Sequence, residues 1–301
     1  MPDQGSEKPG GSGLDRDPLA AELGRTAEYE PGSEPTEHRA GTPGGGPGQL
    51  EPGSTIGGRF IIRRLVARGG MGEVYEAEDT ALKTRVALKT LLPGLAEHPE
   101  SLDRFRREVL LARSVAHPNV CKVFELHSVQ IAGDPLHFLT MEFLEGEPLS
   151  ALMRKRGPLS TSEALPLVRQ MAAALDAAHE HGVVHRDFKP SNVILVQQRG
   201  RDGSEGVRVV VTDFGIARAL STSRQDLEAT GGTRTNEFLG TPDYIAPEQV
   251  SDKDAISGAT DLFALGVVVY QMVTGALPFQ GDTRSRSSQA GCGILPARRS
   301  P

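Results

Sequence analysis

The stretch His-Arg-Asp-Phe-Lys-Pro-Ser-Asn, at residues 185–192, brings together a carboxylate, an ammonium group and a side-chain amide. Further along the chain, Asp-Phe-Gly at residues 213–215 adds a second carboxylate. Phosphoryl transfer needs such groups: a carboxylate that accepts the proton of the attacking hydroxyl, a cation beside the phosphate, and oxygen ligands for Mg²⁺. The residue types and their spacing therefore favour phosphoryl transfer.

Together the two motifs resemble the catalytic loop and the metal-binding loop of a protein kinase, with Phe188 in the place of the usual leucine. The resemblance implies that Asp187 is the catalytic base and that Lys189 reaches the transferring phosphate. It also implies that Asn192 and Asp213 bind Mg²⁺ through their oxygen atoms.

A glycine-rich stretch, Arg-Gly-Gly-Met-Gly-Glu-Val-Tyr at residues 68–75, follows a predicted strand at 60–66. It resembles the kinase loop that covers the ATP phosphates, with Ala67 in the place of the first glycine. Gly69 and Gly72 are expected to let backbone N–H groups approach phosphate oxygens, because glycine has no Cβ.

A third predicted strand ends in Val-Ala-Leu-Lys at residues 86–89 and resembles the strand that carries the ATP-pairing lysine of kinases. The resemblance makes Lys89 that lysine. A predicted helix at residues 102–111 carries Glu108, the expected ion-pair partner of Lys89 in the active arrangement.

Two further strands, around residues 121–126 and 136–141, complete a predicted five-stranded small lobe, and residues 141–146 resemble the linker between kinase lobes. By the family's pattern the linker backbone binds adenine, and apolar side chains enclose the ring. The adenine site expected from the resemblance comprises Val74, Ala87, Met141, Glu142, Leu144 and Ile194.

The sequence between Asp213 and Glu248 resembles a kinase activation segment, ending in Gly-Thr-Pro-Asp-Tyr-Ile-Ala-Pro-Glu. Thr241 lies at the position whose side chain, in serine/threonine kinases, hydrogen-bonds near the residues matching Asp187 and Lys189 of the catalytic loop. Thr233 and Thr235 lie where bacterial members are phosphorylated, and Arg186 is expected to bind such a phosphate. The alternative is that these threonines only form a loop.

Two helices are predicted in the second half of the chain. A capping box of Ser160 and Glu163 starts a long helix, near whose end His179 is expected to be a surface or capping residue. A nearly continuous apolar run at residues 262–273 predicts a buried helix. The resemblance implies that Asp261, just before this run, binds the catalytic-loop backbone, and that His185 holds backbone structure rather than acting as a base.

Composition limits the function classes. The net charge of −6 comes from residues 1–54, where ten acidic residues outnumber four basic ones, so the rest of the chain is neutral. A neutral folded part argues against nucleic-acid binding, which needs a concentrated basic face. The two cysteines, Cys121 and Cys292, suggest neither a disulfide framework nor a zinc site, and the sequence lacks an evident signal peptide or membrane span. We therefore expect a cytoplasmic protein with no membrane segment in this chain.

The predicted fold class is α+β, a two-lobed protein-kinase-like fold with an incomplete C-terminal lobe. We expect a disordered leader at 1–54, a small lobe at 55–143, a partial large lobe at 144–281 and an irregular tail at 282–301. Because this tail lacks helical periodicity, we expect the domain to be truncated or its end to be out of frame.

The chain is therefore identified as resembling the eukaryotic-like (Hanks-type) serine/threonine kinases of bacteria. The resemblance implies ATP and Mg²⁺ as cofactors, protein substrates, autophosphorylation and a possible homodimer for phosphorylation in trans. One alternative is a catalytically impaired fragment that binds nucleotide or a partner. A small-molecule phosphotransferase is disfavoured by the segment at 240–248, which serves peptide substrates in the family.

Overall fold

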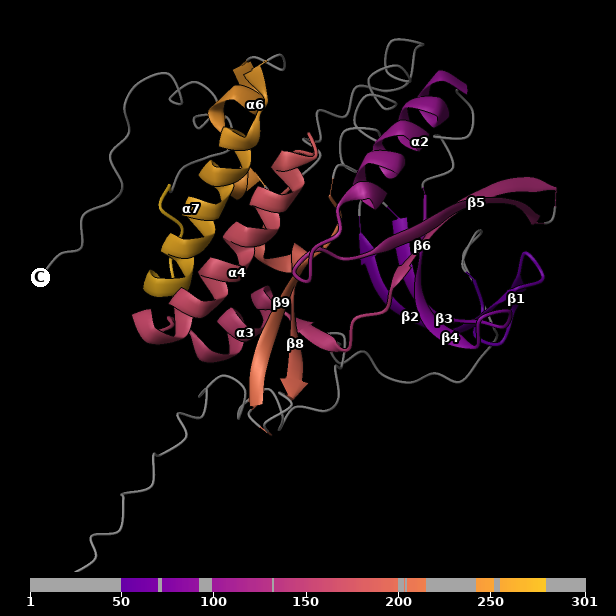
Figure 1. The fold of residues 1–301 in the computed structure, drawn as a ribbon, viewed down its shortest axis with the longest axis horizontal. Coiled ribbons are helices and arrows are strands. Elements are labelled where there is room, and N and C mark those ends of the chain that lie inside the picture. The colour runs from indigo at the N-terminus through magenta and orange to yellow at the C-terminus, as the bar shows by residue number, and fades with distance from the viewer. Residues whose placement is uncertain are drawn as a thin grey trace, which may run out of the picture.

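The computed structural model describes residues 50–69, 72–91, 99–131, 133–199, 203, 205–214, 242–251 and 255–279. These residues form a small lobe built on a β-sheet and a larger, mainly helical lobe, joined by the chain that follows strand β6 (Figure 1). The expected two-lobed α+β architecture is therefore confirmed. The expected regulatory residues Thr233, Thr235 and Thr241, most of the leader and the whole tail lie outside the described residues.

The small-lobe sheet is antiparallel and has six strands in the described residues, where five were expected. The additional edge strand is only two residues long, too short to show an alternating pattern in the sequence. In spatial order the strands are β1 (Thr55–Ile56), β2 (Phe60–Gly69), β3 (Gly72–Asp79), β4 (Thr84–Thr90), β6 (Asp134–Glu142) and β5 (Val123–Ile131).

The packed structure includes residues 50–54, which were expected to belong to the disordered leader. Leu50 is buried, and its N–H donates to the Tyr75 hydroxyl over 3.1 Å. The N–H of Gly53 donates to the carbonyl of Ile62 over 2.7 Å. The expected boundary at residue 54 was therefore too late, because one leucine in a polar stretch gives no periodic signal.

Helix α2 (Pro99–Ser114) packs on the small-lobe sheet through Phe105 and Val109, which share one face at helical spacing and are both buried. These two side chains join a hydrophobic cluster that also contains Ala87 and Met141. The helix that carries Glu108 is thus attached to the sheet that carries Lys89.

The large lobe contains helices α3 (Leu149–Arg156), α4 (Thr161–Glu180), α6 (Pro247–Ser251) and α7 (Gly258–Thr274). Helices α4 and α7 lie side by side (Figure 1) and bury apolar residues such as Met171 and Val268 in a common core. The expected capping box at Ser160 and Glu163 is present, and α7 ends at Gly275, whose φ of 73° suits glycine.

A three-stranded antiparallel sheet faces the small lobe. It consists of β7 (Gly146–Pro148), β8 (Val193–Arg199) and β9 (Glu205–Val211). Strand β8 begins directly after the catalytic loop, which ends in a short 3₁₀ turn at Pro190–Asn192, and it pairs with β9. None of the helices in the described ranges is long and apolar enough to cross a membrane.

Candidate active site

Asp261 fixes the start of the catalytic loop. Its side chain is only 1% exposed, and its two carboxylate oxygens each accept a backbone hydrogen bond of 2.8 Å, from the N–H groups of His185 and Arg186. Bonds from backbone amides to a carboxylate are stronger than bonds between neutral groups. The role expected for Asp261 is thus confirmed: α7 holds the loop that carries Asp187.

The imidazole of His185 is fully buried and connects the catalytic loop to the strand that leads to Asp213. Its Nε2 lies 2.9 Å from the carbonyl oxygen of Thr212, and its ring centroid lies 4.8 Å from that of Phe214. Because its Nε2 contacts a backbone carbonyl and its ring packs against Phe214, His185 holds backbone in place, as expected.

His179 has a role that the sequence analysis missed. Its Nε2 lies 2.7 Å from Oδ2 of Asp261, the same oxygen that accepts from His185 N–H. His179 stands in the last turn of α4, so the contact joins α4 to α7 beneath the catalytic loop. The expectation of a surface or capping residue was wrong, because a contact 82 residues away leaves no local signal.

The predicted catalytic residues of the loop lie together. Nζ of Lys189 donates to Oδ2 of Asp187 over 2.7 Å, and the side-chain N–H₂ of Asn192 donates to the carbonyl of Asp187 over 2.8 Å. The side chain of Asp187 is 13% exposed, so part of it stays accessible to solvent while the ammonium group of Lys189 lies against it.

Lys89 and Asp213 form the second half of the candidate site. The ammonium group of Lys89 is buried and lies 2.8 Å from Oδ1 of Asp213. Burial favours the neutral acid, but the charge of Lys89 and its hydrogen bond outweigh burial and lower the pKa of Asp213 below its ordinary value. Asp213 is therefore ionised at neutral pH and available as an oxygen ligand.

The expected ion pair between Lys89 and Glu108 is not formed among the described residues, where the ammonium group of Lys89 pairs with Asp213. Glu108 is partly buried and has interactions of its own. The pairing of Lys89 with Glu108 in the active arrangement stays a prediction.

The two described glycines of the glycine-rich loop differ in what requires them. Gly72 has a φ of +130°, and a Cβ there would lie 2.0 Å from the carbonyl oxygen of Thr90, so packing alone demands glycine. A Cβ on Gly69, its partner across the β2–β3 pair, would meet nothing within 4 Å. The fold leaves open space at Gly69, as close approach of a ligand phosphate would require.

Most of the expected adenine-site residues belong to one apolar cluster. Ala87 and Met141 are buried in it, and Val74 and Leu144 pack against it. Ile194 is the cross-strand neighbour of Val210, a buried member of the same cluster. The structure thus brings the small-lobe and large-lobe members of the predicted site together.

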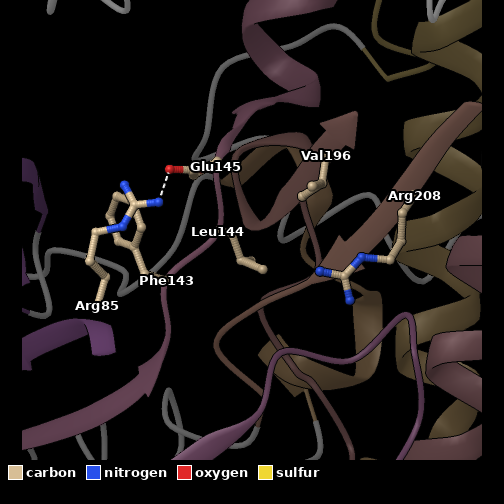
Figure 2. Close-up of a pocket in the computed structure, with 6 residues that line it drawn as sticks. All are labelled: Arg85, Phe143, Leu144, Glu145, Val196 and Arg208. Atoms are coloured by element: carbon tan, nitrogen blue, oxygen red, sulfur yellow. Dashed lines mark hydrogen bonds and ion pairs between the residues drawn. The ribbon is translucent and has the colours of Figure 1, made fainter. Parts of the chain in front are cut away.

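The linker between the lobes borders a pocket of about 350 Å³. Figure 2 shows Arg85 and Phe143 on one side of the linker and Arg208 on the other, with Leu144 between them. The guanidinium of Arg85 lies 5.3 Å from the ring centroid of Phe143 and pairs with Glu145. The full lining comprises Arg85, Phe143, Leu144, Glu145, Val196 and Arg208.

Arg208 holds Glu142, the second residue of the linker. Its Nη2 lies 2.9 Å from Oε1 of Glu142, and its Nη1 donates to the carbonyl of Pro118 over 3.2 Å. The other carboxylate oxygen of Glu142 is buried and has no hydrogen-bond partner among the described residues. The side chain of Glu142 is therefore occupied by its ion pair with Arg208, and the backbone of Glu142 is the part expected to bind adenine.

The donor set of Asn192 and Asp213 fits Mg²⁺. The amide nitrogen of Asn192 is used in bonds to Asp187, which leaves its amide oxygen as the possible ligand, and Asp213 contributes a carboxylate. Mg²⁺ prefers such hard oxygen ligands and is commonly held by one or two protein groups together with substrate phosphates.

Comparisons with known proteins identify the family to which the chain is similar. The model of the protein kinase domain family matches residues 60–295, a range that includes part of the expected irregular tail. Serine/threonine-protein kinase PknA of Mycobacterium tuberculosis is 41% identical over 231 residues, which cover 76% of this chain and 50% of PknA. Serine/threonine-protein kinase PrkC of Bacillus subtilis is 38% identical over 231 residues, covering 77% of this chain and 33% of PrkC.

Among solved structures, the kinase domain of Mycobacterium tuberculosis PknI superposes with a TM-score of 0.58 and 28% sequence identity. The superposition covers 77% of this chain and 80% of that domain. The chain thus spans about half the length of PknA and about a third of the length of PrkC. It spans most of the PknI kinase domain.

Proposed function

This chain belongs to the protein kinase domain family, and from this premise we propose that it is an ATP-dependent protein serine/threonine kinase. The observation that supports the proposal best is the placement of Asp187 against Lys189 and Asn192, on a loop anchored by a buried carboxylate. This placement is suited to transfer of the ATP γ-phosphoryl group to a hydroxyl.

Asp187 would act on the acceptor. Its carboxylate accepts the proton of the attacking serine or threonine hydroxyl, which directs the oxygen at the phosphorus. Lys189, 2.7 Å from that carboxylate, places a positive charge where the transferring phosphoryl gains negative charge. Asn192 holds the backbone of Asp187 and so limits how far the base can move.

The opposite wall of the cleft would hold the nucleotide. Lys89 is a buried cation that can pair with phosphate oxygens, and Val74, Ala87, Met141 and Ile194 offer apolar surface to adenine. Bound Mg²⁺ neutralises phosphate charge, and Asn192 and Asp213 are the residues that would bind it.

We extend the proposal to regulation. Thr233 and Thr235 are proposed as autophosphorylation sites, with Thr241 bonding the catalytic loop and a homodimer supplying the second copy for reaction in trans. Arg186 precedes the catalytic base, so a phosphate bound to its guanidinium would connect phosphorylation directly to the loop.

Protein substrates and a cytoplasmic location complete the proposal, which assigns no role to nucleic acid. The neutral charge of the chain beyond residue 54 supports the last point, and the free, buried thiol of Cys121 is consistent with a reducing compartment.

The test is transfer of labelled γ-phosphate from ATP to casein in the presence of Mg²⁺, with Asp187→Asn as the matched variant. Transfer by the parent chain and its loss in the variant are expected, with label recovered as phosphoserine or phosphothreonine. Nucleotide binding by both chains without transfer by either would reject the kinase proposal and support the impaired-fragment alternative.

A further inference from the structure

The side chain of Gln249 connects the end of the activation segment to the catalytic loop. Its Oε1 accepts from the N–H of Ala246 over 3.0 Å, and its Nε2 donates to the carbonyl of Arg186 over 2.8 Å. Ala246 is fully buried, and Arg186 directly precedes the proposed base Asp187. One amide group thus bridges two segments 60 residues apart, using its acceptor on one and its donor on the other.

The bond to Arg186 acts on an unusual stretch of backbone. Arg186 has a φ of +68°, in the left-handed region that residues other than glycine rarely adopt. Its N–H is held by Asp261, and its carbonyl is held by Gln249. The N–H at the other end of the same peptide, that of Asp187, faces Nδ1 of His185 at 3.3 Å. Gln249 therefore fixes the orientation of the peptide from which Asp187 projects.

We propose that Gln249 is a positioning residue for phosphoryl transfer, which holds Asp187 in place through the carbonyl of Arg186. This inference rests on the proposed kinase function, because only then is Asp187 the base. It assigns a role to the glutamine that directly follows the Ala-Pro-Glu sequence at residues 246–248. This glutamine takes no direct part in phosphoryl transfer.

The simpler explanation is that Gln249 only caps helix α6. As the third residue of that helix it accepts from the amide before the first turn, which is half of a capping box. Glutamate makes this bond equally well, since a carboxylate accepts hydrogen bonds. Glutamate cannot donate to the carbonyl of Arg186, so Gln249→Glu keeps the cap and removes the bridge.

The experiment compares kcat and KM for ATP in the parent chain, Gln249→Glu and Gln249→Met. Methionine removes the bridge without adding a charge, so it separates loss of the donor from electrostatic effects on Asp187. We expect kcat to fall by about tenfold or more in both variants, because small displacements of a catalytic group are costly, and KM for ATP to change less than about twofold. Gln271→Glu is the control, since its bond from the Tyr244 hydroxyl, 2.7 Å long, needs only an acceptor.

A kcat of Gln249→Glu equal to that of the parent and of Gln271→Glu would overturn the inference and leave the kinase proposal intact. Hydrogen exchange of the peptide covering residues 183–189 provides a readout without catalysis. Faster exchange there in both Gln249 variants, with the control unchanged, supports the positioning role; unchanged exchange contradicts it. An inactive parent chain would reject the proposed function, while the exchange result would still decide whether Gln249 holds the loop.

Discussion

The two halves of the candidate site are held in different ways. On the large-lobe side, Asp261 of α7 and Gln249 of α6 both bond the backbone of the catalytic loop. Within the loop, the ring of His185 contacts the carbonyl of Thr212, which precedes Asp213. On the small-lobe side, Lys89 has a single ion-pair partner among the described residues, Asp213, which is itself an expected metal ligand. The proposed base, Asp187, is already held in place, whereas Lys89 and Asp213, the groups expected to bind nucleotide and metal, are paired with each other.

This difference suggests how the site would work. A base that is already in position needs no rearrangement when the acceptor arrives, which lowers the cost of reaching the transition state. Lys89 must instead exchange Asp213 for phosphate oxygens, and we expect Glu108 to take up its paired position at that stage. Nucleotide binding should therefore change the small-lobe half and leave the catalytic loop nearly as it is.

The largest effect is expected from Asp261→Ala. The substitution leaves the buried N–H groups of His185 and Arg186 without their acceptor, which should lower the free energy of unfolding by about 3 kcal/mol or more. Urea denaturation measures this loss, and Asp103→Ala is the control because its carboxylate is exposed and pairs with the exposed Arg106. Equal stability of the two variants would show that the large-lobe anchor is not needed.

Lys89→Met should come next and should affect activity most. It removes the cation that lowers the pKa of Asp213 and that is proposed to bind phosphate, so we expect kcat/KM for ATP to fall by about a hundredfold or more. The assay is labelled phosphate transfer at saturating protein substrate, with the folded state checked by circular dichroism. Transfer at the parent rate would remove Lys89 from the site.

His179→Ala sharpens the comparison within the large lobe. It removes one of the contacts of Asp261 but leaves both backbone bonds, so we expect kcat to fall by about tenfold with KM nearly unchanged. His181→Ala is the matched control, because His181 is exposed and its ring contacts the carbonyl of Ala177 near the end of α4, not Asp261. If both variants behave alike, the contact between His179 and Asp261 serves no catalytic purpose.

The smallest effect is expected at the linker. Arg208→Gln weakens a partly exposed ion pair worth about 0.5–1 kcal/mol, which corresponds to an increase in KM for ATP of about two- to fivefold. Arg199→Gln, on the neighbouring strand, breaks a fully exposed pair with Glu205 and should change nothing. An unchanged KM in Arg208→Gln would mean that the linker backbone is fixed without Glu142.

Features encoded by neighbouring residues were predicted well from the sequence. The capping box at Ser160, the buried helix over residues 262–273 and the grouping of Asp187, Lys189 and Asn192 each depend on residues a few positions apart. The resemblance to kinases also placed Asp261 at the catalytic-loop backbone, a contact that periodicity alone would not reveal.

Contacts that depend on the packing of distant segments were not predicted. His179 contacts Asp261 only because α4 and α7 lie side by side. Gln249 contacts Arg186 only because α6 lies near the catalytic loop. Whether Lys89 pairs with Asp213 or with Glu108 depends on distances in the folded protein, which cannot be read from the sequence. Strand β1 was not predicted for a related reason: it is two residues long and is defined by its pairing with β2.

Hydrogen exchange with and without Mg²⁺ and ADP tests the contrast between the two halves most directly. The peptide covering residues 183–189, which contains the first part of the catalytic loop, should be strongly protected without nucleotide and change little on binding, while helix α2 and strand β4 should gain protection. A catalytic loop that exchanges rapidly until nucleotide binds, and then gains as much protection as α2, would contradict the claim that the base is positioned in advance.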